Sequence, residues 1–293
     1  MQRGDIVYYM QPNVRKPDLV AAFLGWPDAA QVSTSAVSYL IDKLPAVKLA
    51  EVKSDDYYDF TKIRPTINIE KGIISPLNVP RNGLYYWKNS EGDNDLIFLT
   101  GIEPQVHWQL YAEMIADLAG FYKVRRAYFI GGLYDRIPHT RETRISGLVN
   151  DRGMLEVLKK FNVEPIDYSG PSSIHGLLMN MFAHRRIPAV SLWGHIPFYI
   201  RSENNPMVCL EMVKKLASIL GVSIDLHELK RSAHKLYQEL NKMLTENEQM
   251  NDFLKSLETQ YDLEGSSFGT EVEGDDQIIK DIEYFLKRKR QDS

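Results

Sequence analysis

Several loops of this 293-residue sequence combine glycine with side chains that can bind anions, donate protons or stack on a partner. Each of these loops follows a short apolar run, and in an open parallel sheet ligands bind where the strands end. A glycine after a strand can also serve the turn alone. The candidate ligand-binding or interface residues are Trp26, Asp28, Glu103, Trp108, Gly131, Gly132, His139, Arg141, Ser172, Ser173, His195 and Tyr199.

The most strongly charged of these loops runs over residues 135–144 and contains Arg136, His139, Arg141 and Arg144. Arginine offers forked donors to a phosphate or carboxylate, and histidine can titrate near neutral pH. The same cations could instead pair with acids of their own chain or of a neighbouring subunit. We expect the loop to lie at a subunit contact or at the mouth of the strand-end cleft, without acting as a catalytic centre by itself.

The segment from Tyr168 to Gly176 reads as a strand-to-helix turn in which Ser172 or Ser173 caps the helix. It contains neither a Walker loop nor a nucleophile elbow. The histidines are spaced as structural residues rather than as metal ligands, and no dinucleotide-binding glycine pattern occurs. We therefore predict no cofactor and no metal, and we assign no catalytic residue.

Composition and charge narrow the class of protein. Lys and Arg number 35 against 39 Asp and Glu, a net charge of −4, which argues against a nucleic-acid partner. No apolar run reaches the roughly 18 residues needed to span a membrane. The first residues lack the pattern of a secretory signal, and a lone Cys209 excludes an internal disulfide framework, so we expect a cytoplasmic protein.

Buried strands alternate with helices through the first two thirds of the chain. Apolar runs at 18–24, 47–52, 95–100, 126–130 and 188–193 are separated by helical patterns, which predicts an α/β fold with a mostly parallel, doubly wound sheet. The strand at 126–130 is expected to stop at Gly131-Gly132. Residues 55–94 predict an antiparallel excursion with a turn at Asn82-Gly83.

The pattern divides the chain into a core domain, 1–225, and a helical extension, 226–293. Within the extension a polar linker covers about 264–276. We expect the short apolar stripe of the last helix, 277–286, to dock on the main body or on a neighbouring subunit.

Residues 57–111 are unusually rich in aromatic side chains, too many for the core of one small hairpin. Because aromatic residues are enriched at interfaces, this density predicts a homo-oligomer. Alternatively, these aromatic side chains are buried within their own domain.

Five segments in the same order resemble the proteasome assembly chaperone family, particularly its bacterial branch. They are Ala21–Ala29, Gly101–Trp108, Gly131–Arg141, Gly170–Leu178 and Trp193–Tyr199. The resemblance covers nearly the whole chain. It implies a nucleoside phosphorylase-like α/β fold, a homo-oligomer, most simply a trimer, and kinship with chaperones that hold proteasome subunits.

Two functions remain open at this point. The first is a non-enzymatic, oligomeric protein-interaction module with a proteasome-related or other protein partner. The second is a small-molecule-binding enzyme, hydrolase- or phosphorylase-like, that uses the glycine-rich strand ends with Glu103, His139 and Arg141. Convergence of these side chains with Ser172 in one pocket would favour the enzyme.

Overall fold

The computed structural model describes residues 6–53, 56–264, 280 and 282. The strands are β1 (Ile6–Tyr8), β2 (Asp18–Leu24), β3 (Val47–Val52), β4 (Ile69–Glu70), β5 (Ile73–Ile74), β6 (Asn82–Trp87), β7 (Leu96–Ile102), β8 (Arg126–Asp135), β9 (Ile145–Val149), β10 (Glu164–Pro165) and β11 (Ala189–Pro197). The helices are α1 (Val32–Lys43), α2 (Trp108–Phe121), α3 (Leu155–Lys160), α4 (Ile174–His184), α5 (Pro206–Leu220), α6 (His227–Glu246) and α7 (Glu248–Glu264).

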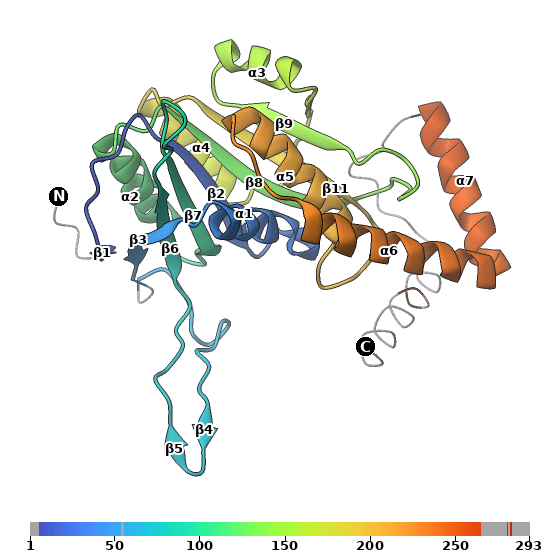
Figure 1. Ribbon diagram of the computed structural model, residues 1–293, viewed down its shortest axis with the longest axis horizontal. Coiled ribbons are helices and arrows are strands. Elements are labelled where there is room, and N and C mark those ends of the chain that lie inside the picture. The colour runs from blue at the N-terminus through green and yellow to red at the C-terminus, as the bar shows by residue number, and fades with distance from the viewer. Residues whose placement is uncertain (1–5, 54–55, 265–279, 281, 283–293) are drawn as a thin grey trace.

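Nine strands of the described part form one sheet in the order β1-β3-β6-β7-β2-β8-β11-β9-β10. The central strands β7, β2, β8 and β11 run parallel, and antiparallel strands flank them on both sides. Helices cover both faces (Figure 1). The predicted α/β fold with a large, mostly parallel sheet is confirmed, and the sheet is mixed.

Strand β2 shows why the central strands are apolar throughout. Its alternate residues Leu19, Ala21 and Phe23 enter the core beneath α2 and α4, while Val20 and Ala22 enter the core beneath α1 and α5. A strand buried on both faces has no solvent side, so its sequence is a continuous apolar run.

The strand over 126–130 does not stop at Gly131-Gly132 as the sequence predicts. It continues to Asp135, paired with β11 along its length. The Trp193 ring lies on Gly131, and a Cβ at this position would come within 2.5 Å of that ring. The glycine therefore gives room for a cross-strand indole rather than for a turn. Strand β9 is absent from the sequence-based prediction.

The predicted turn at Asn82-Gly83 is also wrong, because these residues begin β6. The buried Asn82 amide oxygen accepts hydrogen bonds from the Tyr58 hydroxyl (2.8 Å) and the Ile102 N–H (2.7 Å). Its amide nitrogen donates to the Tyr111 hydroxyl (2.5 Å). Asn-Gly is a strong local hairpin signal, and these long-range bonds override it.

The excursion contains a long arm, residues 66–78, that projects from the body (Figure 1). Strands β4 and β5 pair only with each other within the described residues. The aromatic residues of 57–111 are buried or half-buried in their own domain, so they give no reason for an oligomer. The arm, by contrast, exposes five large apolar side chains, which are those of Ile67, Ile69, Ile73, Ile74 and Leu77.

The C-terminal helices pack on the body through a separate apolar cluster. Leu240 of α6 and Leu254 of α7 join Tyr199 and Ile200, which follow β11. Most of the predicted linker and last helix lies outside the described residues. Ile282 is described, and its side chain is buried in the same cluster.

The contact between Gly131 and Trp193 can be tested by adding one methyl group. Gly131→Ala should lower the free energy of unfolding by about 1–3 kcal/mol, because the Cβ meets the indole ring. Gly120→Ala, in α2 with no atom near its Cβ, should raise it by about 0.5–1 kcal/mol. Urea denaturation of both variants measures the difference. Equal effects would contradict the packing explanation.

Candidate functional site

Glu103 joins three segments at the carboxyl ends of β2 and β7. One carboxylate oxygen accepts from the Ile174 N–H (2.8 Å) at the start of α4, and the other accepts from the Trp26 N–H (3.3 Å). Burial raises the pKa of Glu103. Gly25 approaches its side chain with φ of 140°, a conformation that favours glycine. Both carboxylate oxygens therefore serve the loops themselves.

The segments that Glu103 ties together present apolar side chains to solvent. Trp26 is 61% exposed, and Leu24, Val106 and Leu110 are exposed nearby in the chain. Trp108 begins α2 and donates its indole N–H to the Pro104 carbonyl (2.5 Å). These side chains form an exposed apolar surface.

Asp28 and Gly132 stabilise the turn between β2 and α1. The Asp28 carboxylate accepts from the Ser33 N–H (2.7 Å) and hydroxyl (2.6 Å), and from the Thr34 hydroxyl. Burial raises the pKa of Asp28. The Gly132 N–H donates to the Pro27 carbonyl (2.8 Å). The contacts of Asp28 and Gly132 thus give both residues a structural role in this turn.

His139 and Tyr199 form a buried pair beneath the C-terminal helices. The Tyr199 hydroxyl lies 2.7 Å from the His139 backbone nitrogen and 2.7 Å from its Nδ1 atom. The backbone N–H donates to this hydroxyl, which then donates to Nδ1. Burial lowers the pKa of His139 to about 4, so its imidazole is neutral at pH 7.

The loop over 135–144 lies against α7 of its own chain. Arg141 makes a forked ion pair with Asp262 (2.9 and 2.7 Å) and contacts Glu258 (3.2 Å). Thr140 also bonds to Glu258, and Arg136 donates to Gln260 (3.2 Å). These cations are engaged within the chain. A subunit contact at this loop stays a prediction.

Ser173 caps α4 by accepting from the His175 N–H (3.2 Å), whereas the exposed Ser172 donates to the Ser173 carbonyl (3.0 Å). The helix cap expected at this pair of serines thus falls on Ser173. His175 itself is buried among Phe23, Phe129 and Trp193. Burial lowers its pKa to about 3.

His195 belongs to a hydrogen-bonded chain that the sequence-based prediction missed. Its Nε2 lies 2.7 Å from the Ser146 hydroxyl, and its Nδ1 lies 2.6 Å from the Asp135 carboxylate. None of the three residues is more than 4% exposed. Asp135 was placed in a loop and β9 was not predicted, so only the pairing of β8, β11 and β9 brings these groups together.

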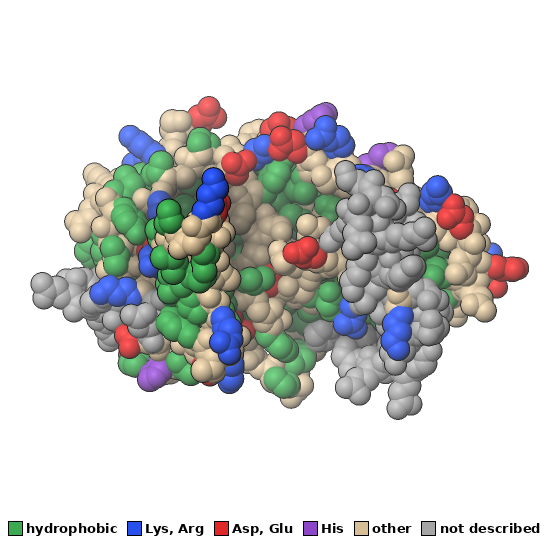
Figure 2. All heavy atoms as spheres, turned by 90° about the horizontal axis from the view of Figure 1, so that it is seen from below, with side chains coloured by type: hydrophobic (Ala, Val, Ile, Leu, Met, Phe, Trp, Pro, Cys, Tyr) green, Lys and Arg blue, Asp and Glu red, His purple; other side chains and the backbone are tan. Residues whose placement is uncertain are grey.

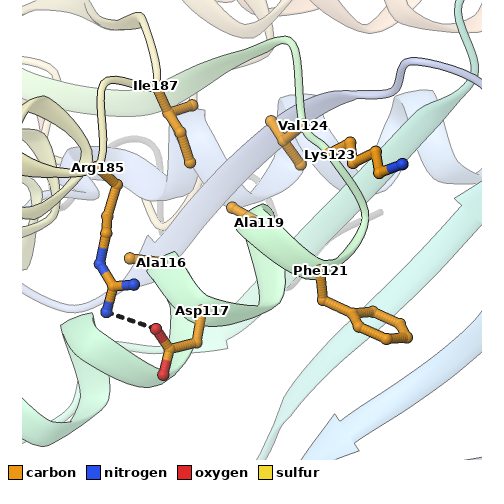
Figure 3. A pocket seen from close by; sticks show the side chains of 9 residues that line it. Ala116, Asp117, Ala119, Phe121, Lys123, Val124, Arg185 and Ile187 are labelled. Atoms are coloured by element: carbon orange, nitrogen blue, oxygen red, sulfur yellow. Dashed lines mark ion pairs between the residues drawn. The ribbon is translucent and has the colours of Figure 1, made fainter. Parts of the chain in front are cut away.

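Neither of two hollows in the described part of the chain brings Glu103, His139, Arg141 and Ser172 together. A cavity of about 10 Å³, room for about one water, is lined by His139, Arg141, His195 and Asn205 but not by Glu103 or Ser172. A pocket of about 540 Å³ lies at the opposite edge of the sheet, between the end of α2 and the start of β11 (Figure 3). Its ion pair joins Asp117 to Arg185 (2.5 Å).

The neutral, buried His139 makes stability depend on pH. Because its pKa falls from about 6.5 in the unfolded chain to about 4, the folded state binds the proton less tightly. Stability is full above pH 6.5 and should fall by about 2–3 kcal/mol between pH 7 and 4.5 from this residue. His139→Gln should remove that part of the loss in urea titrations. His184→Gln, on the exposed end of α4, is the control and should leave the loss intact.

Comparisons with known proteins agree with this architecture. The PAC2 family model matches residues 22–244. A PAC2 family protein from Streptomyces avermitilis is 30% identical, with a TM-score of 0.71, over 77% of this chain and 95% of that chain. A proteasome-assembly chaperone homologue from Mycobacterium tuberculosis is 25% identical, with a TM-score of 0.74, over 81% and 99%.

Pyrococcus furiosus PbaB, described as an archaeal proteasome activator, shares the fold at 24% identity and a TM-score of 0.64, over 81% of this chain and 97% of that chain. A search of curated proteins found no match. The family match covers more than two thirds of the chain and includes Trp26, Glu103, Gly131 and His195. The chain therefore belongs to the PAC2 family.

Proposed function

We propose that this chain is an oligomeric protein-interaction module of the assembly-chaperone type, whose task is binding rather than catalysis. Membership of the PAC2 family supports this proposal, as does the description of one similar structure as a proteasome-assembly chaperone homologue. A proteasome-related protein is accordingly the first partner to test. We also propose that it acts in the cytoplasm. No helix of the described residues is both long and apolar enough to cross a bilayer.

The observation that carries the proposal is the arm. Ile73 and Ile74 at its tip are 75% and 64% exposed, and Ile69 is 57% exposed. Hydrophobic side chains gather on this projection in the view from below (Figure 2). A two-stranded hairpin is marginal in water by itself, and large apolar patches mark contact sites. The arm thus has the character of an element that seats on another protein surface.

We propose a second copy of the chain as the occupant, in line with the oligomer that the family resemblance implies. If the arm of one subunit binds a different surface of the next, the contact is heterologous. Such contacts close into a ring when the rotation permits, and a trimer is the smallest ring above a dimer. This reasoning replaces the aromatic density of residues 57–111 as the reason for an oligomer.

The glycine-rich loops do not support the enzyme alternative built on Glu103, His139, Arg141 and Ser172. Glu103 binds two backbone N–H groups, and Arg141 binds carboxylates of α7. These groups are thus committed to separate structural contacts, which favours the interaction module over that alternative.

Replacing the tip isoleucines tests the assembly. The double variant Ile73→Ser/Ile74→Ser should shift the mass in light scattering from a multiple of 33.7 kDa to 33.7 kDa at micromolar protein. Leu155→Ser, which removes an exposed apolar side chain from α3, is the matched control and should keep the oligomer. A monomeric wild-type protein, or an unchanged mass in the double variant, would refute the role of the arm.

A further inference from the structure

Three neighbouring strands place Asp135, His195 and Ser146 on one face of the sheet. His195 stands on β11, between β8, which carries Asp135, and β9, which carries Ser146. Side chains alternate along a strand, and Ala189 of β11, Phe129 of β8 and Leu148 of β9 mark the face beneath α2 and α4. Each member of the trio lies an even number of residues from its marker, so all three point to this face.

The trio also lies at the edge of the sheet where ligands bind in parallel folds. Asp135 is the last residue of β8, and His195 stands two residues before the end of β11. Ser146 is the second residue of the antiparallel strand β9. His195 is also one of the residues that line the cavity beside His139.

The hydrogen bonds define the protonation of the imidazole. A carboxylate can only accept, so the 2.6 Å contact with Asp135 places the proton on Nδ1. In the neutral imidazole Nε2 carries a lone pair, and the Ser146 hydroxyl, 2.7 Å away, then donates to it. Asp135 is held by the Arg136 N–H (2.7 Å) and lies 3.8 Å from Arg144. This arrangement has the nucleophile, the base and the orienting acid of a serine hydrolase.

We propose that Ser146, His195 and Asp135 form a latent acyl-transfer site, an activity beyond the proposed binding function. Ser146 Oγ attacks the carbonyl carbon of an ester as its proton passes to His195 Nε2 and the carbonyl π pair moves to oxygen. Collapse re-forms the carbonyl and expels the alcohol, which takes that proton. Water then attacks the acyl-serine and gives a proton to Nε2. The acid leaves, and Ser146 recovers its proton. Asp135 is a positioning residue that holds the imidazole.

The charges near the trio favour an uncharged acyl group. Arg144 lies 3.8 Å from Asp135 and pairs with Glu164 (2.8 Å), so its positive charge is already compensated by two carboxylates. Ser146 is fully buried, but its register partner Trp193 and its strand neighbour Leu148 are only half-buried. Removal of the indole is therefore the substitution chosen to expose Ser146.

Ser191 serves as an internal control for Ser146. Ser191 is a second buried serine, 3.4 Å from Nδ1 of His175. The contacts of His175 that the structure describes include three aromatic rings and no carboxylate. If the hydrogen-bonded trio of Asp135, His195 and Ser146, here called the relay, activates the serine, an electrophile should react with Ser146 and not with Ser191.

A small alkyl fluorophosphonate is the probe, because its reaction with serine forms an O–P bond, expels fluoride and passes the serine proton to the imidazole. Intact-mass and peptide mass spectrometry should place one label on Ser146 in the folded wild type and in Ser191→Ala, and none in Ser146→Ala. Trp193→Ala should label faster. Asp135→Asn should slow labelling about 10²–10⁴-fold and move the half-maximal rate to lower pH, a change that a purely structural role would not cause.

Hydrolysis of p-nitrophenyl acetate should follow the same order among these variants. Circular dichroism and urea midpoints identify variants that remain folded, so that lost labelling is not mistaken for unfolding. The proposal is overturned if neither the wild type nor folded Trp193→Ala labels at Ser146. It is equally overturned if folded Asp135→Asn labels at the wild-type rate with the same pH dependence. Either result would leave the trio as a structural polar network.

Discussion

The burial of the central parallel strands on both faces is the constraint on which the rest of this structure depends. Strands β2, β7, β8 and β11 lie between two helical layers, so polar groups placed on them are stabilised by partners inside the protein. Polar side chains therefore occur in bonded groups. Asn82 joins Tyr58, Ile102 and Tyr111, and Ser146 joins His195 and Asp135.

Because the middle of each strand is buried, polar side chains that can reach solvent or a loop stand at the strand ends. There they also form hydrogen bonds with the loops. Glu103 and Ser173 accept from backbone N–H groups at the start of α4, Asp28 does so at the start of α1, and Asn205 does so at the start of α5. Helix starts leave several N–H groups without partners, so such acceptors stabilise the helices. This accounts for polar residues at strand ends without assigning any of them to a ligand.

Protein binding and acyl transfer, the two proposed functions, depend on different parts of the molecule and on different interactions. Binding rests on apolar side chains of the arm that stay outside the core, where their burial requires another surface. Acyl transfer rests on a buried relay inside the sheet, where a low dielectric strengthens each hydrogen bond. The arm precedes β6 on one side of the parallel strands, and the trio lies on β8, β11 and β9 on the other side, so we expect substitutions in one to leave the other intact (Figure 1).

The apolar pattern of the chain is enough to predict the class of fold and the central strands. The run from Asp18 to Leu24 is apolar at nearly every position because burial on both faces requires it, and its predicted bounds match β2. Family membership was likewise readable from short segments such as Gly101–Trp108. The positions of Gly131 and Asn82 inside strands depend on long-range packing, because a cross-strand indole and a buried amide network override local turn signals. The tertiary structure alone brings Ser146 and His195 together, since strand pairing joins residues 49 positions apart and no local pattern encodes that register.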